Sequence, residues 1–198
     1  MNRFILLSIG FMILISTWSC SQGAKYKQME RRELASGERH DSLFLGIYFG
    51  MESKPFFDHC WQMNKEHLVK EGPGSATVEY IPPDFKEKTQ MLFYPKFYEN
   101  KIYQMPVEFS YEAWAPWNKE LFSDKLQLEV VRVLEKWYGK GFIKLHYKTH
   151  GDLYVKVDGN RRISVWIEDD QKVKVLFTDV MIDNKIKEEN KTKRLSSK

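Results

Sequence analysis

The strongest constraint on the fold is a run of alternating apolar and polar residues between positions 143 and 177. Apolar side chains occupy every second position in four short segments, and turn residues separate these segments. Because the side chains of a strand point alternately to its two faces, the pattern predicts four β-strands that share one apolar face. We expect an antiparallel meander with turns at 149–152, 159–161 and 169–172. The apolar set is Ile143, Leu145, Tyr147, Leu153, Val155, Val157, Ile163, Val165, Ile167, Val173, Val175 and Phe177.

A helix is expected before this meander, packed on its apolar face. Ser123 and Asp124 suit the start of a helix, and Gly139 suits its end. The apolar residues between them recur at three- and four-residue steps, which places them on one side of the helix. These residues are Leu126, Val130, Val133, Leu134 and Trp137.

The preceding region repeats this order of elements after an apolar lead-in at 43–49. A helix is expected from Ser53, with Pro55 in its first turn and Gly72 closing it. Its apolar face consists of Phe56, Phe57, Cys60, Trp61 and Leu68. Strands are expected at 76–81, 89–97 and 102–111.

Together these patterns predict an α+β fold of two tandem units, each a helix followed by an antiparallel sheet. The first unit is expected at 42–116 and the second, with the four-stranded meander, at 117–182. A flexible tether is expected at 20–41, which is mostly polar, and a disordered basic tail at 183–198.

The N-terminus has the layout of a secretory signal, expected to be removed as residues 1–19. Arg3 gives a positive start, 4–18 is an apolar run, and Ser19 precedes Cys20. The apolar run is shorter than the roughly 20 residues that span a membrane. Release into the periplasm by an ordinary signal peptidase and retention as an uncleaved short anchor are the alternatives to lipid attachment.

Ser19-Cys20 resembles the lipobox of bacterial lipoproteins. The resemblance implies that Cys20 carries a lipid anchor of the palmitate type and that the domain is held at a membrane. Ser21 after the cysteine resembles the signal for sorting to the outer membrane, with the domain facing the periplasm or the cell surface. Thr17 and Trp18 depart from the usual lipobox.

The net charge of +4 belongs to the ends of the chain. Residues 185–198 hold six basic and two acidic residues, and Arg3 adds one more positive charge, so the body is close to neutral. A neutral body excludes an extended nucleic-acid face. We interpret the basic tail as solvated; contact with anionic lipid is the alternative.

No catalytic or metal signature is present, and no cofactor is expected. The five histidines lack a metal-ligand spacing, and the chain has no Cys-x-x-Cys and no Gly-x-Ser-x-Gly. Cys60, Asn64 and His67 share one side of a helix, yet the apolar neighbours of Cys60 favour a buried core residue over a nucleophile. We therefore predict that the protein is not an enzyme.

A binding patch is predicted on the polar face of the second sheet. A three-residue turn at 159–161 would place Tyr154 directly opposite Trp166, with His146 and Leu176 on the same face. Burial of this face by the first unit is the alternative. Trp114 and Trp117, in the connector between the units, are expected to fill the seam between them, with sugar stacking as the alternative.

Gly50-Met51 before a helix, with Phe56 inside it and a strand meander after it, resembles the small outer-membrane assembly lipoproteins of the BamE/SmpA type. A tandem copy of such a unit also resembles the β-lactamase inhibitor protein. The resemblance implies an α+β fold and an assembly or scaffold role at the outer membrane, and it carries over no functional residue. We expect a membrane-anchored binding module with a protein or glycan partner; a hydrophobic-ligand carrier and an enzyme of unrecognised class are the alternatives.

Overall fold

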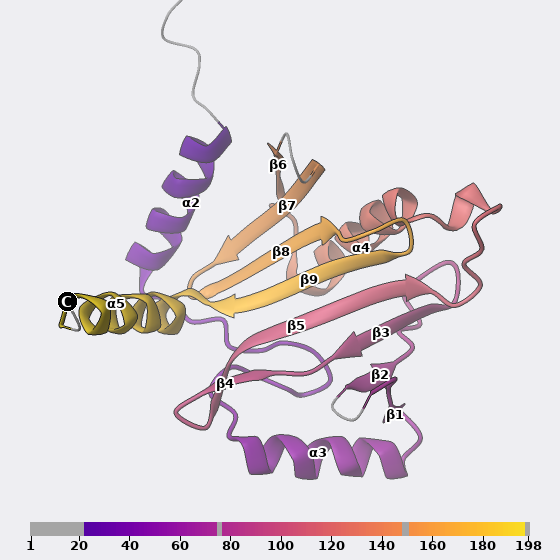
Figure 1. Cartoon of the computed structure of the whole chain (residues 1–198), viewed down its shortest axis with the longest axis horizontal. Helices are drawn as coiled ribbons and strands as arrows, with labels where there is room; N and C mark the ends of the chain where they lie inside the picture. The colour runs from indigo at the N-terminus through magenta and orange to yellow at the C-terminus, as the bar shows by residue number, and fades with distance from the viewer. Residues whose placement is uncertain (1–21, 75–76, 148–150, 197–198) are drawn as a thin grey trace, which may run out of the picture.

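The computed structural model describes residues 22–74, 77–147 and 151–196 (Figure 1). Its helices are α2 (Gln22–Ser36), α3 (Ser53–Lys65), α4 (Ser123–Tyr138) and α5 (Val180–Ser196), with a short 3₁₀ helix at Lys119–Leu121. None of the helices in these ranges is long and apolar enough to cross a membrane. The expected signal at 1–19 and Cys20 lie outside the described residues.

One antiparallel sheet of nine strands carries the rest of the fold, so the α+β class is confirmed. Eight strands follow one path across the sheet, and β4 (Lys96–Tyr98) pairs with the same side of β5 as β3 does. In spatial order the eight are β1 (Val69–Glu71), β2 (Val78–Tyr80), β3 (Thr89–Phe93), β5 (Lys101–Tyr111), β9 (Lys172–Asp179), β8 (Arg161–Ile167), β7 (Gly151–Asp158) and β6 (Ile143–Tyr147).

The prediction of two separate helix-and-sheet units was wrong, because β5 of the first half pairs with β9 of the second. Their register runs from Gln104 with Thr178 to Ser110 with Lys172. The strands β6 to β9 are consecutive neighbours, but they continue the larger sheet and do not form a meander of their own. Pairing of β5 with β9 removes the two exposed edges that separate sheets would present.

The apolar residues of the second half do not share one face, in contrast to the prediction. Asp158 pairs with Arg161, so the turn between β7 and β8 has two residues where three were expected. Val157 consequently lies opposite Arg162 and not Ile163. A shift of one residue moves every side chain of a strand to the other face. The apolar residues of β7 therefore lie on the face opposite to those of β8 and β9.

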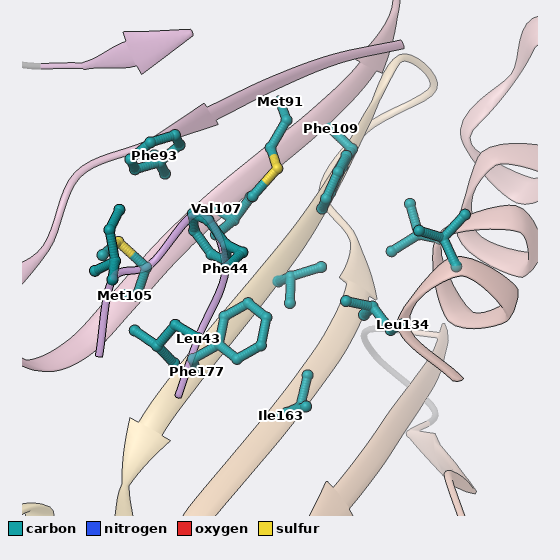
Figure 2. Close-up of a cluster of buried hydrophobic side chains, with 14 of the residues drawn as sticks. Leu43, Phe44, Met91, Phe93, Met105, Val107, Phe109, Leu134, Ile163 and Phe177 are labelled. Carbon is teal, nitrogen blue, oxygen red and sulfur yellow. The ribbon is translucent and has the colours of Figure 1, made fainter. Parts of the chain in front are cut away.

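The main core lies on the face formed by Ile163, Val165 and the alternate apolar residues of β3, β5 and β9. The helix α4 covers the part of this face over β8, β9 and β5, and contributes Leu126, Val130, Val133 and Leu134. The segment 42–51, which contains the lead-in, covers a neighbouring part of this face. There Phe44 packs edge-on against Phe93 and Phe177 (Figure 2). Complete burial of one such aromatic side chain stabilises the fold by about 2 to 3 kcal/mol.

The opposite face holds a smaller cluster under α2. Leu145, Val155 and Val157 are buried there, and Tyr26 and Met29 of α2 pack on them. The segment expected to be a flexible tether is therefore largely a helix. Tyr26 and Met29, three residues apart, pack on this cluster. Two apolar residues are too few to distinguish an amphipathic helix from a polar linker by sequence.

The segment expected to be a disordered basic tail is also helical as far as Ser196. Asp179 accepts hydrogen bonds from the amides of Met181 and Ile182 and so stabilises the start of α5. Val180 and Asp183 are buried against the sheet, whereas the rest of α5 is mostly exposed. The helix thus depends on its first turn, which lies before the basic run.

A buried polar network fastens the segment between α2 and the lead-in to the turn of β7 and β8. The Asn160 side chain accepts a hydrogen bond from the amide of His40 and donates to Asp41 and Asp179. At Gly159, where φ is +51°, a Cβ would lie 2.3 Å from the carbonyl oxygen of Glu38. Only glycine permits the chain to pass this close with that backbone angle.

Beside this turn, one carboxylate balances two buried cations. Asp158 accepts hydrogen bonds from Lys156 at 2.6 Å and from Arg161 at 3.2 Å. Lys156 also donates to the carbonyl oxygen of Tyr138, and Arg161 to that of Ser42. The cluster therefore ties the end of α4 and the lead-in to the sheet.

Replacement of Asp158 by asparagine should lower the free energy of unfolding by about 3 to 5 kcal/mol, because Lys156 and Arg161 would be left buried without a counter-charge. The measurement is urea denaturation of both proteins. Asp170→Asn, an exposed aspartate, is the matched control and should change stability by less than about 0.5 kcal/mol. Equal losses in the two variants would contradict the role assigned to Asp158.

Candidate binding surfaces

The structure separates the two aromatic residues of the predicted patch. Tyr154 pairs with Val165, and its ring packs against the main core. Trp166 follows Val165 in β8 and therefore lies on the other face of the sheet, beside Lys174 of β9. The prediction that Tyr154 lies opposite Trp166 was wrong, because the turn between β7 and β8 has two residues where three were expected. Any binding role of either residue stays a prediction.

Trp166 and Leu176 do share a face, as predicted, but salt bridges lie beside them. Leu176 pairs with Ser164, two residues before Trp166. Glu108 of β5 lies between Lys172 and Lys174, at 3.0 and 2.5 Å from their ammonium groups. Although burial alone would raise the pKa of Glu108, the hydrogen bonds from both lysines bring it below its ordinary value. This face is a mixed sheet surface with half-buried apolar residues.

The remaining predicted residues are dispersed over the molecule. His146 is exposed at the edge strand β6, with its Nδ1 2.9 Å from the Asp152 carboxylate. Trp114 is half-buried, packs against the main core and lies 6.0 Å from the ring of Phe122. Trp117 is 84% exposed, so it fills no seam. The six predicted binding residues thus do not form one site.

The most exposed aromatic cluster lies on α3 and was not predicted. Phe57 and Trp61 are 49% and 61% exposed, and Leu68, in the turn after the helix, is 45% exposed. We call Phe57 and Trp61, which line one groove, the α3 surface. From the sequence, these residues were expected together on the apolar face of the helix that begins at Ser53. Large apolar side chains exposed together on a folded body are typical of a contact surface.

A groove of about 360 Å³ runs beneath the α3 surface. The helix provides one wall, with Phe57, Cys60 and Trp61, and the hairpin of β1 and β2 provides the other. Tyr94 also lines it, with its ring 6.4 Å from that of Phe57. Lys65 lies over the Trp61 ring at 3.3 Å and so places a positive charge at the rim. The groove combines aromatic walls with a few polar groups, as small-ligand and peptide sites do.

Local sequence explains why α3 has two apolar stripes. Phe56 and Met63 point into the core and are buried, and Cys60 is half-buried beside them. Phe57 and Trp61 form a second stripe, four residues apart, one position further round the helix. The helix α3 packs on the edge of the sheet, against the short strand β1 and against Phe97 of β4, and this edge leaves Phe57 and Trp61 about half exposed. In the sequence, the signal for an exposed second stripe was the width of the apolar arc on this helix.

Cys60, Asn64 and His67, the residues considered as a thiol site, have different surroundings in the structure. Burial raises the pKa of the Cys60 thiol to about 11, as its apolar neighbours predict, so little thiolate forms near neutral pH. His67 is exposed in a left-handed backbone conformation, and Asn64 donates its side-chain amide to the carbonyl oxygen of Val69. Among the described residues, no group of three or more His, Cys, Asp or Glu side chains is placed to hold a metal ion.

Comparison with known proteins found no match. No family model, no curated protein and no solved structure matches this chain. The resemblance to bacterial lipoproteins and to BamE/SmpA-type proteins therefore stays a prediction from the sequence.

Proposed function

We propose that this protein is an exported, lipid-anchored and non-catalytic module that binds a protein partner at the outer membrane. The observation that carries the proposal is the α3 surface, where Phe57 and Trp61 stay about half exposed although the body has a well-packed core. The N-terminal signal and Cys20 support the location.

The position of the α3 surface relative to the expected anchor supports a role in binding. The first described helix after Cys20 is α2, which contacts β6 and β7 at one edge of the sheet. The helix α3 contacts β1 at the opposite edge, and Figure 1 shows the two helices at opposite ends of the molecule. A domain anchored through Cys20 would therefore present the α3 surface away from the attachment point.

A second candidate is the binding of a glycan, which the groove beneath α3 favours. Aromatic walls such as those of Phe57, Trp61 and Tyr94 provide flat rings against which a sugar can stack. Asn64 and Thr77 supply polar groups at the same groove. An assembly module and a glycan-binding module would use the same residues, so the experiment has to separate them by ligand.

Replacement of Cys20 by alanine should abolish labelling with radioactive palmitate and shift the protein from the membrane fraction to the soluble fraction or to an unprocessed precursor. The physical reason is that the thiol is the expected acyl acceptor. Cys60→Ser is the matched control and should leave both readouts unchanged. Labelling that persists in Cys20→Ala would refute the anchor.

The double substitution Phe57→Ser with Trp61→Ser should abolish binding of the partner to the α3 surface. The melting temperature should stay within a few degrees of the parent value, because both side chains are about half exposed. The measurement is cross-linking in intact cells, combined with a glycan array for the purified protein. Trp117→Ser, at an exposed tryptophan elsewhere, is the control and should retain binding.

Loss of a specific cross-linked protein only in the double variant supports the assembly module. Loss of an array signal only in the double variant supports the glycan module. Identical cross-links and identical array signals in all three proteins would contradict a binding role of the α3 surface.

A further inference from the structure

The helix α5 has two parts with different electrostatic surroundings. In its first part, Lys187 lies 2.7 Å from Asp183 of the same helix, and Lys185 lies 3.2 Å from Glu99, which lies between β4 and β5. Glu189 accepts a hydrogen bond from the hydroxyl of Tyr98 at 2.8 Å. The contacts of Lys185 with Glu99 and of Glu189 with Tyr98 hold this part of α5 beside β4, and Asp183 and Glu99 balance its two lysines.

The second part of α5 is strongly basic. Residues 190–198 contain Lys191, Lys193, Arg194 and Lys198 and no acidic residue. From Asn190 to Ser196 every residue is exposed, including Leu195. Because the body between Cys20 and Asn184 is close to neutral, the positive potential of the protein is concentrated at this end.

The basic end and the expected anchor leave the sheet at one corner. Arg162 of β8 lies 3.5 Å from Glu30 of α2 and 3.5 Å from Asp183 of α5, so it joins the two helices. Figure 1 shows α2 and α5 projecting from the same end of the strands, with α3 on the other side of the molecule. The start of α2 and the end of α5 both project outward from this corner, on the side of the molecule away from α3 (Figure 1).

We propose that the basic end of α5 binds the anionic lipid headgroups of the membrane that holds the Cys20 anchor. The proposal rests on the proposed membrane location and adds a second contact to it. Lysine ammonium groups are compact charges suited to phosphate, and exposed Leu195 can enter the boundary between headgroups and acyl chains. A lipid chain together with a basic patch holds a protein more stably and orients it, whereas a flexible single anchor leaves its orientation free.

The test uses the chain from residue 20 onward with Cys20→Ser, so that no lipid contributes. The described fold begins at Gln22, so this protein contains the whole described body. Its partition is measured by sedimentation with vesicles of phosphatidylcholine alone and with vesicles that also contain phosphatidylglycerol. We expect binding only to the phosphatidylglycerol vesicles, and weaker binding as salt is added, because salt screens exposed charges.

The variant Lys191→Glu, Lys193→Glu, Arg194→Glu should bind these vesicles about a hundredfold more weakly, since each basic residue near an anionic surface contributes about a fivefold change. The variant Lys86→Glu, Lys125→Glu, Lys140→Glu changes the net charge equally at other exposed lysines and should lose only a few-fold. Unfolding by urea checks that both variants are folded.

The proposal would be overturned if the two triple variants bound the vesicles equally. It would also be overturned if the parent protein bound both kinds of vesicle equally, or if it bound neither kind. Failure of the Cys20 anchor is distinguishable, because palmitate labelling does not depend on α5 and vesicle binding here does not depend on Cys20.

Discussion

The pairing of β5 with β9 is the interaction on which the rest of the structure depends. Seven consecutive residue pairs join strands that are more than sixty residues apart in the chain. Their alternate side chains, Val107 with Val175 and Phe109 with Val173, lie at the centre of the main core. Without this pairing, each half would keep an exposed sheet edge and a core open on one side. The lead-in residue Phe44 packs on Phe93 of one half and Phe177 of the other, so it depends on the same junction.

The two terminal helices are attached to this sheet in a different way. Neither α2 nor α5 enters the main core, and both are held mainly by charge around Arg162 and by short apolar contacts. Interactions of partly exposed charges are weaker than burial of a core side chain and are sensitive to salt. The body therefore has a rigid centre and more easily displaced ends. In our proposal the ends face the membrane, and α3 faces the partner.

Local patterns in the sequence predicted the helices at Ser53 and Ser123, the positions of most strands and the α+β class. The assembly of these elements was not predicted, because it depends on details that periodicity does not contain. One residue in the turn at Gly159 decided which face holds Val155 and Val157, and thereby separated Tyr154 from Trp166. The sequence pattern identified the apolar arc of α3 but not its partial exposure, which depends on how little of the edge of the sheet lies against the helix. The helices α2 and α5 were missed because tertiary contacts, and not an amphipathic period, support them.

Native-state hydrogen exchange tests the central claim, that the two halves form one cooperative sheet, most directly. If the β5 and β9 pairing unites the fold, the slowest amides of β3, β5, β8 and β9 will exchange with one common free energy, equal to that of global unfolding. Fraying is expected only at α2, α5 and the edge strands β1 and β6. Two distinct free energies, one for the strands up to β5 and another for β6 to β9, would show that the halves unfold independently and would contradict the account.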